Sequence, residues 1–211
     1  MNGSAGMVKN WITMGVVSGL LVSILYPALI FVPMPAVLQV VLIMAFGPLL
    51  GLSSVGLLHF ISLYKKTIAP LVAVISNIIA GVLITSMLLI QSAIRSSKPD
   101  TFDVSSKWAW KSINQVHLGV DVAWDVYIFL GTFLFAVSMF NHPKFGKAFS
   151  ISGIVISLLL IAFNAISFPI PPANSGLIDM GPFVGLWYLA VTIAIIKNFK
   201  WIESQQRLKE T

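Results

Sequence analysis

The sequence contains no cysteine and few charged residues. Of its 211 residues only 9% are charged, whereas 57% are hydrophobic. The absence of cysteine excludes disulfides, thiolate metal sites and a cysteine nucleophile within this chain. The shortage of charge leaves too little polar surface to cover a soluble globule, so the composition predicts an integral membrane protein.

Acidic residues are the scarcer of the two signs of charge. Seven Asp and Glu face thirteen Lys and Arg, which gives a formal net charge of +6. A basic chain can bind nucleic acid, but here the basic residues lie between apolar runs and form no single patch. We therefore expect the lipid bilayer as the surroundings of this chain and no nucleic-acid partner.

Long apolar runs predict the fold class. A helix needs about 20 apolar residues to cross a hydrocarbon core of roughly 30 Å. The expected fold is an all-α polytopic transmembrane bundle, a single domain over residues 1–211. We expect the first run to be a retained span, because Pro33-Met34-Pro35 follows it in place of a small-residue cleavage site. The six predicted spans are residues 11–32, 36–64, 69–94, 117–140, 149–168 and 182–197.

The positions of the basic residues predict the orientation. Cytoplasmic ends of spans are enriched in Lys and Arg, so the side with nine of the thirteen is expected to be inside, with both termini there. The inner residues are Lys9, Lys65, Lys66, Lys144, Lys147, Lys197, Lys200, Arg207 and Lys209, and the outer ones are Arg95, Lys98, Lys107 and Lys111.

Two outer connections are longer than turns. Residues 95–116 mix charged residues with Trp108 and Trp110, and tryptophan favours the headgroup level, so we expect a short amphipathic piece along the outer interface. Residues 169–181 are apolar and rich in proline, so they cannot be a regular helix. We expect this second segment to fold back over the outer mouth of the bundle.

The fourth predicted span contains the most unusual residues. Only fifteen uncharged residues follow Asp125, from 126 to 140, so a full span must also include Asp121 one turn earlier. Residues three or four apart are neighbours on a helix, which places His117 on the same face; Trp124 lies beside them. Ionisable groups inside a span are costly, and they indicate a functional site.

Other spans carry polar residues near the same outer level. We predict an outward-facing polar pocket around the two aspartates, with Arg95 as the counter-charge. An alternative stays open: a buried Asp can also hydrogen-bond to an amide or indole and hold helices together. Asp179 can equally complement the dipole at the start of the last span. The other predicted pocket residues are Gln39, Gln91, Asn164 and Asp179.

Small and amide residues predict contacts between helices. Gly15 and Gly19 in the first span, and Gly47 and Gly51 in the second, have the four-residue spacing that lets two backbones approach closely. Such faces permit a homo-oligomer without requiring one. Asn77, inside the third span, is expected to form a hydrogen bond between helices.

No cofactor can be assigned from the sequence. There is no His-Glu-x-x-His motif. Bis-histidine haem is disfavoured, because His117 is expected at the outer level and His59 and His142 at the inner one. Carboxylates and imidazole suit a metal ion, but Asp121, Asp125 and His117 belong to one helix and rarely complete a metal shell alone, so no metal site is predicted.

Four groups of residues in the C-terminal half form recognisable motifs: Gly119-Val-Asp121-Val-Ala-Trp124-Asp125, Asn141-His142-Pro143-Lys144-Phe145-Gly146, Phe168-Pro169-Ile-Pro171-Pro172-Ala173, and Gly176-Leu-Ile-Asp179-Met-Gly181-Pro182 with Gly185-Leu-Trp187-Tyr188. With these motifs the chain from about Gly119 to Trp187 resembles small bacterial multi-span inner-membrane proteins of unknown function. The resemblance implies a multi-pass protein of the bacterial inner membrane, in which the two aspartates and the proline-rich segment act together. It implies no activity.

Three classes of function remain open. The first is a pocket that binds or transports a small polar or cationic ligand or a proton. As a subunit of an importer the chain would need an energy-supplying partner, because it has no nucleotide-binding loop. The second is a membrane-embedded enzyme that acts on a lipid headgroup, with the carboxylates as general acid and base. The third is a structural or assembly subunit.

Overall fold

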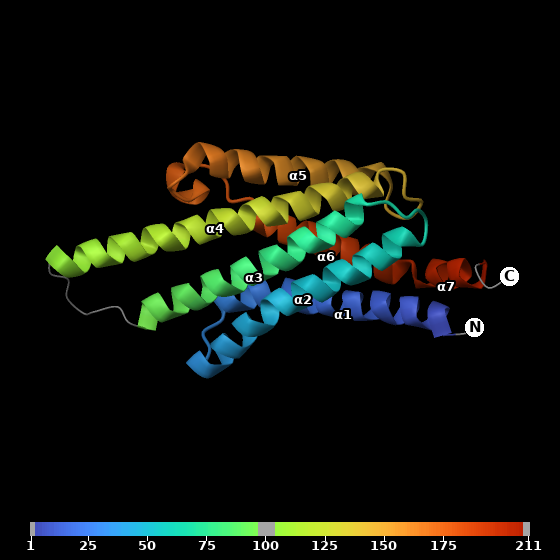
Figure 1. The fold of residues 1–211 in the computed structure, drawn as a ribbon, viewed down its shortest axis with the longest axis horizontal. Helices are drawn as coiled ribbons and strands as arrows, with labels where there is room; N and C mark the ends of the chain where they lie inside the picture. The colour runs from blue at the N-terminus through green and yellow to red at the C-terminus, as the bar shows by residue number, and fades with distance from the viewer. Residues whose placement is uncertain (1–2, 97–103, 209–211) are drawn as a thin grey trace.

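The protein is a bundle of long helices (Figure 1). The computed structural model describes residues 3–96 and 104–208, and every regular element in these two ranges is helical. The all-α class predicted from the apolar runs is therefore confirmed. The elements are α1 (Gly3–Phe31), α2 (Ala36–Ser62), α3 (Ala69–Ser96), α4 (Val104–Met139), α5 (Gly146–Ser167), the short 3-10 helix η1 (Pro172–Ser175), α6 (Gly181–Lys197) and α7 (Phe199–Leu208).

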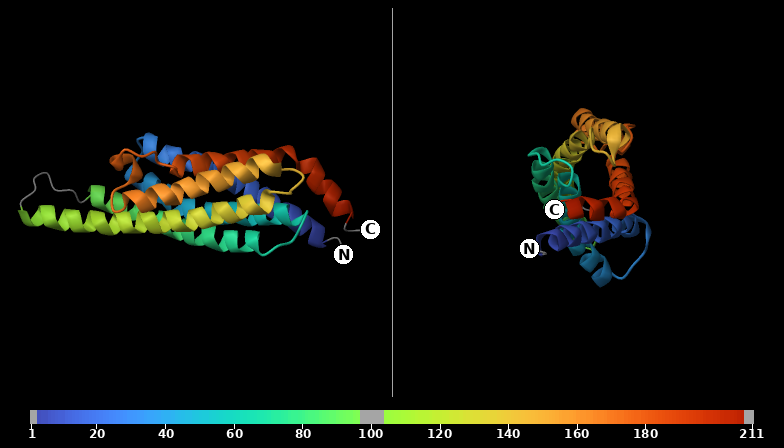
Figure 2. Two further views of the ribbon diagram at one scale, coloured as in Figure 1. Left: turned by 90° about the horizontal axis from the view of Figure 1, so that it is seen from above. Right: turned by 90° about the vertical axis from the view of Figure 1, so that its right-hand side faces the viewer.

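Successive long helices run antiparallel, so both termini lie at the same end of the bundle (Figure 1). Each helix from α1 to α5 packs against the next one in the chain, and α6 packs against both α5 and α1. The last long helix therefore closes the bundle, as the end-on view in Figure 2 shows. We call the end away from the termini the distal end.

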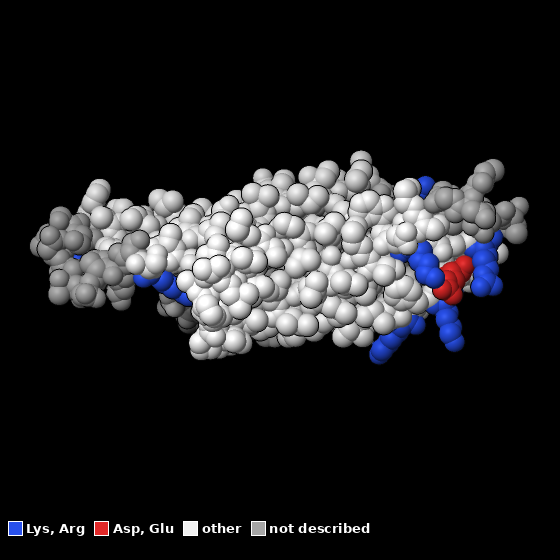
Figure 3. All heavy atoms as spheres, turned by 90° about the horizontal axis from the view of Figure 1, so that it is seen from below, with Lys and Arg blue, Asp and Glu red and all other residues white. Residues whose placement is uncertain are grey.

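The surface between the two ends suits a bilayer. Each helix from α1 to α5 is long and apolar enough to cross a membrane. Helices α6 and α7 meet at a bend of 60° and qualify as a sixth span only as a pair. The face in Figure 3 has Lys and Arg near both ends and a broad uncharged band between them. Five or six spans of an integral membrane protein follow from these lengths.

The predicted outer segment 95–116 differs from the observed structure. Helix α3 continues to Ser96, and residues 104–116 form the first turns of α4, a single helix of 36 residues, in place of a piece turned along the interface. No Gly or Pro occurs from 104 to 118, so nothing interrupts this helix. Residues 97–103, with Lys98, Asp100 and Asp103, lie outside the described residues.

The proline-rich segment 169–181 forms the connection from α5 to α6. Its short helix η1 packs against α5. Gly176 ends η1 with a φ of 82°, a conformation that favours glycine. The last residues of the segment lead into the start of α6. That the segment covers the outer mouth of the bundle stays a prediction.

Glycines permit the closest crossings between helices. The backbones of α1 and α2 touch where Gly15 meets Gly56, and those of α2 and α3 touch where Gly47 meets Gly81. A β-carbon at any of these four positions would collide with the backbone opposite. The close approach predicted at Gly15 and Gly47 is confirmed; their partners Gly56 and Gly81 were not predicted.

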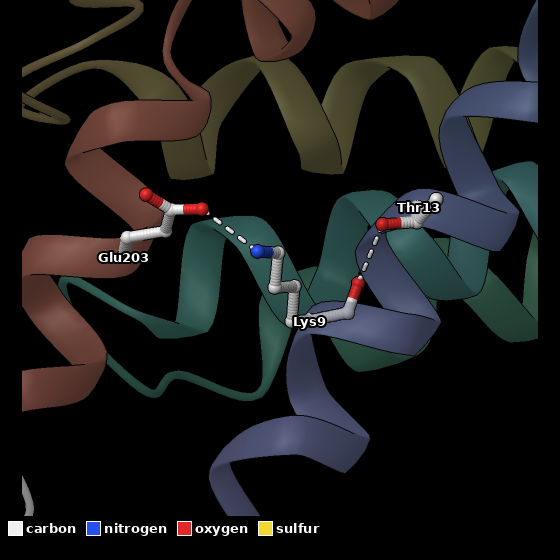
Figure 4. A network of polar contacts seen from close by, with 3 residues as sticks. All are labelled: Lys9, Thr13 and Glu203. Atoms are coloured by element: carbon white, nitrogen blue, oxygen red, sulfur yellow. Dashed lines mark hydrogen bonds and ion pairs between the residues drawn. The ribbon is translucent and has the colours of Figure 1, made fainter.

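The helix α7 is held near the start of α1. Lys9 Nζ lies 2.7 Å from Oε1 of Glu203, and Thr13 Oγ1 donates to the Lys9 carbonyl at 2.9 Å (Figure 4). An ion pair this exposed contributes little to stability. Ile202, which is fully buried, is the stronger anchor of α7.

A buried polar cluster joins four helices in the middle of the bundle. Asn77 Nδ2 of α3 donates to Ser54 Oγ of α2 at 2.8 Å and to Tyr188 Oη of α6 at 2.7 Å. Thr132 of α4 donates to the same phenol oxygen at 3.4 Å. The interhelical hydrogen bond predicted for Asn77 is therefore confirmed, and we call these four residues the Asn77 cluster.

Replacing Asn77 by alanine is expected to destabilise the bundle. The Asn77→Ala variant loses two interhelical hydrogen bonds, which should lower the free energy of unfolding by about 1–2 kcal/mol. Equilibrium unfolding in mixed micelles measures this loss. Ser86→Ala is the matched control, because among the described residues the Ser86 hydroxyl donates to the Val82 carbonyl of its own helix and to no other helix. Equal stability of the two variants would contradict a tethering role for Asn77.

A histidine is buried among aromatic rings near the termini. His142 lies between α4 and α5 and is 1% exposed, with ring centroids of Phe60, Phe145 and Trp201 within 5.4 Å. The backbone N–H of Lys144 donates to Nδ1 at 3.2 Å, so the neutral ring carries its proton on Nε2. Burial lowers the His142 pKa from 6.5 to about 4, and the Lys144 charge acts in the same direction.

This histidine should make stability depend on pH. Because the pKa of His142 is lower in the folded protein, the unfolded chain binds more protons between pH 6.5 and 4, so stability falls as the pH falls through this range. Thermal unfolding at a series of pH values measures the slope. His142→Phe should flatten it by removing this proton uptake, and an unchanged slope in that variant would assign the pH dependence to other groups.

Candidate functional site

The two aspartates of α4 lie toward the distal end in different surroundings. Asp121 is partly exposed and lines a cavity of about 220 Å³, whereas Asp125, one turn further along, is 5% exposed. The sequence placed both on one helix face, and the structure separates them by depth. We call this space the acidic cavity.

Four helices contribute to the acidic cavity. The antiparallel arrangement brings the end of α1, the start of α2, the end of α3 and the first half of α4 to one level, so residues distant in sequence meet there. Four of the predicted pocket residues are among those that line it. The lining consists of Tyr26, Leu29, Gln39, Ile43, Met87, Leu88, Gln91, Ser92, Arg95 and Asp121.

Asp125 faces α5. The side chain of Asn164 lies within hydrogen-bonding reach of the Asp125 carboxyl group. Asn164 is itself buried, and its Nδ2 donates to the Leu160 carbonyl at 3.0 Å. The predicted residues Asp125 and Asn164 are thus brought together, beside the acidic cavity and outside its lining.

His117 is joined to α3. Its Nε2 lies 2.7 Å from Nε2 of Gln91. Because the Gln91 nitrogen can only donate, His117 Nε2 accepts, and the neutral ring carries its proton on Nδ1. Arg95 lies close enough to affect His117 electrostatically. Within residues 3–96 and 104–208, Arg95 forms no ion pair with Asp121 or Asp125, so its role as counter-charge stays a prediction.

Asp179 brings a third carboxyl group to the site from the proline-rich segment. Its Oδ1 accepts a hydrogen bond from the Gly181 backbone N–H at 2.9 Å, the helix-start role expected of this residue. It is also close enough to interact electrostatically with Asp121 and Asp125. The proline-rich segment therefore contributes charge to the site, although its short helix lies against α5.

Tyr26 and Ser92 are polar lining residues that the sequence analysis did not indicate, and Tyr26 is the one that the carboxyl groups reach. It lines the acidic cavity, and all three carboxyl groups act on it electrostatically. A tyrosine near the end of an apolar run is typical of an interfacial anchor, so the sequence pattern did not indicate a binding role for Tyr26. Trp124, which was predicted, has a buried indole N–H with no hydrogen-bond partner among the described residues.

Among the described residues, the site holds more acidic groups than permanently basic ones. Its three carboxyl groups, with the Tyr26 phenol and the amides of Gln39, Gln91 and Asn164, stand against the one guanidinium of Arg95. In the described ranges, no three His, Asp or Glu side chains are placed to hold a metal ion. Comparison with protein-family models, with curated proteins and with solved structures finds no match.

The depth difference between the aspartates can be measured by cysteine labelling, because the chain has no native cysteine. A thiol reacts only where the reagent reaches it, so a polar methanethiosulfonate should modify Asp121→Cys ~10-fold faster than Asp125→Cys. Asn77→Cys, in the buried cluster, is the unreactive control. Equal rates for the two aspartate positions would contradict the separation of cavity and buried site.

Proposed function

We propose that this protein binds a small polar cation or a proton at the distal end of its transmembrane bundle, with the buried Asp125 as primary acceptor, Asp121 as its partner at the acidic cavity and Asp179 as a supporting charge. The site faces the outer side of a bacterial inner membrane, with both termini in the cytoplasm. The protein acts in uptake or transport, alone or as a subunit with a partner.

One observation carries the proposal: three carboxyl groups interact at one end of the bundle, and none of the three forms an ion pair among the described residues. Asp125 is buried and Asp121 is partly buried, whereas Asp179 is exposed and adds its charge from the edge of the site. A charge that is removed from water, as at Asp125, requires a compensating charge or a proton. A bound cation or proton supplies this compensation. The acidic cavity, of about 220 Å³, gives a small ligand a place beside Asp121.

The charge distribution supports the orientation. The inner side carries the larger share of Lys and Arg, nine of thirteen along the chain. The distal end, where α3 ends and α4 begins, then lies outside, so the acidic cavity is supplied from the outer solution. Uptake from that side would place Asp121 first on the path and the buried Asp125 second.

Native mass spectrometry of wild type and Asp125→Asn tests the proposal. The wild type is expected to retain a small adduct that the folded variant loses. Where the ligand is a proton, the infrared spectrum of the wild type should show a protonated carboxylic acid that Asp125→Asn removes. Asp125→Glu, which keeps the acid, is the matched control and should retain either signal.

Two results would contradict the proposal. One is a wild type with neither an adduct nor a protonated carboxylic acid. The other is an adduct that stays at full occupancy in both Asp121→Asn and Asp125→Asn, because the ligand would then lie elsewhere. Size-exclusion profiles and unfolding midpoints of each variant separate loss of the ligand from loss of the fold.

A further inference from the structure

A second cavity, of about 340 Å³, lies beside the acidic cavity between α1, α2, α4 and α6. Its walls include Pro27 of α1, Phe46 of α2 and Ile128 of α4, and no basic residue is among the described residues that line it. Phe31 and Leu186, at its edge, are 78% and 61% exposed. The space therefore opens on the apolar surface of the bundle, and we call it the apolar groove.

The apolar groove ends at carboxyl and aromatic groups. Gly181, the first residue of α6, lines it; a β-carbon there would lie 3.2 Å from Asp179 Oδ1, 3.8 Å from Trp124 Cη2 and 3.9 Å from Tyr26 Oη. Tyr26 also lines the acidic cavity, so the two spaces share a wall. A carboxylate beside aromatic rings is the surrounding in which organic cations are held.

The apolar groove has room for further atoms and a hydrogen-bond donor without a partner. Gly185 lines the groove, and no atom would lie within 4 Å of a β-carbon placed on it. The indole N–H of Trp124, another lining residue, is buried without a partner among the described residues. Helix α6 therefore presents an open face here, between the exposed surface and the acidic end.

We infer that the ligand of this protein is a lipophilic cation, whose positive head lies by Asp179, Trp124 and Tyr26 and whose apolar body lies in the groove between α1 and α6. This inference rests on the proposed function and names the class of its ligand. Attraction to three nearby carboxyl groups selects a cationic head, and the apolar walls select a hydrocarbon body. Asp179, next to the groove, repels the head of an anionic amphiphile, and no basic residue is among the described residues that line the groove.

Three matched probes test the inference by equilibrium dialysis of the purified protein against empty micelles. Tritiated octyltrimethylammonium should bind saturably, one per protein. Octyl sulfate, with the same chain and the opposite charge, should not compete. Tetramethylammonium, the head alone, should bind ~100-fold more weakly, because it buries no chain.

Two glycines supply matched variants. Gly185→Leu fills the groove and should weaken octyltrimethylammonium binding at least ~10-fold without changing tetramethylammonium binding. Gly119 on α4 also has no atom within 4 Å of an added β-carbon, and it lies outside the groove lining. Gly119→Leu should therefore leave the binding of both cations unchanged. Asp179→Asn should weaken both cations. Unfolding midpoints check that each variant is folded.

The binding results distinguish failure of the lipophilic-cation inference from failure of the proposed function. Competition by octyl sulfate, or full octyltrimethylammonium binding by Gly185→Leu, would overturn the lipophilic-cation inference. If octyltrimethylammonium fails to bind while the wild type keeps an adduct or a protonated acid that Asp125→Asn removes, this inference fails and the proposed function stands. If all of these signals are absent, both fail.

Discussion

The arrangement of the distal end depends on the hydrogen bonds that Asn77 makes in the middle of the bundle. Helix α6 packs mainly against α1 and α5, and the bond from Asn77 to Tyr188 ties it to the far side of the bundle. In hydrocarbon neither group has water as an alternative partner, so the bond favours one rotation of α6. The bond from Trp187 Nε1 to the Phe149 carbonyl holds the other side of α6, and the start of α6 carries Gly181 next to Asp179.

Two of the three carboxyl groups at the distal end have structural partners. A contact with Asn164 would satisfy Asp125, and Asp179 accepts a hydrogen bond from the Gly181 N–H at the start of α6. Neither contact explains Asp121, which faces the acidic cavity and lies close enough to both to interact electrostatically. Repulsion between the buried Asp125 and its two acidic neighbours is unfavourable for the fold, and the proposed cation or proton would relieve it. Under the proposal, the same repulsion that lowers stability provides the attraction for the ligand.

The helical fold and the level of the polar residues could be predicted from the sequence, because both follow from the length and order of the apolar runs. Antiparallel spans of similar length put Gln39, Gln91, Arg95 and Asp121 at one level, and the acidic cavity contains all four. Residues 104–116 were misassigned because a helix that extends beyond the bilayer and a helix that lies on it have the same composition. The groove was missed because it depends on how far α6 stands from α1, which no local pattern records.

The geometry also weighs against the enzyme alternative. Acid–base catalysis on one headgroup requires both carboxyl groups to reach the same reacting atoms. Asp121 lines the acidic cavity, whereas Asp125 is buried toward Asn164, so the two face different surroundings. A phosphate-bearing headgroup would also meet three carboxyl groups at this end, against the one guanidinium, that of Arg95, among the described residues that line the acidic cavity. Binding of a cation requires only that charge and the shared wall at Tyr26, and both are present.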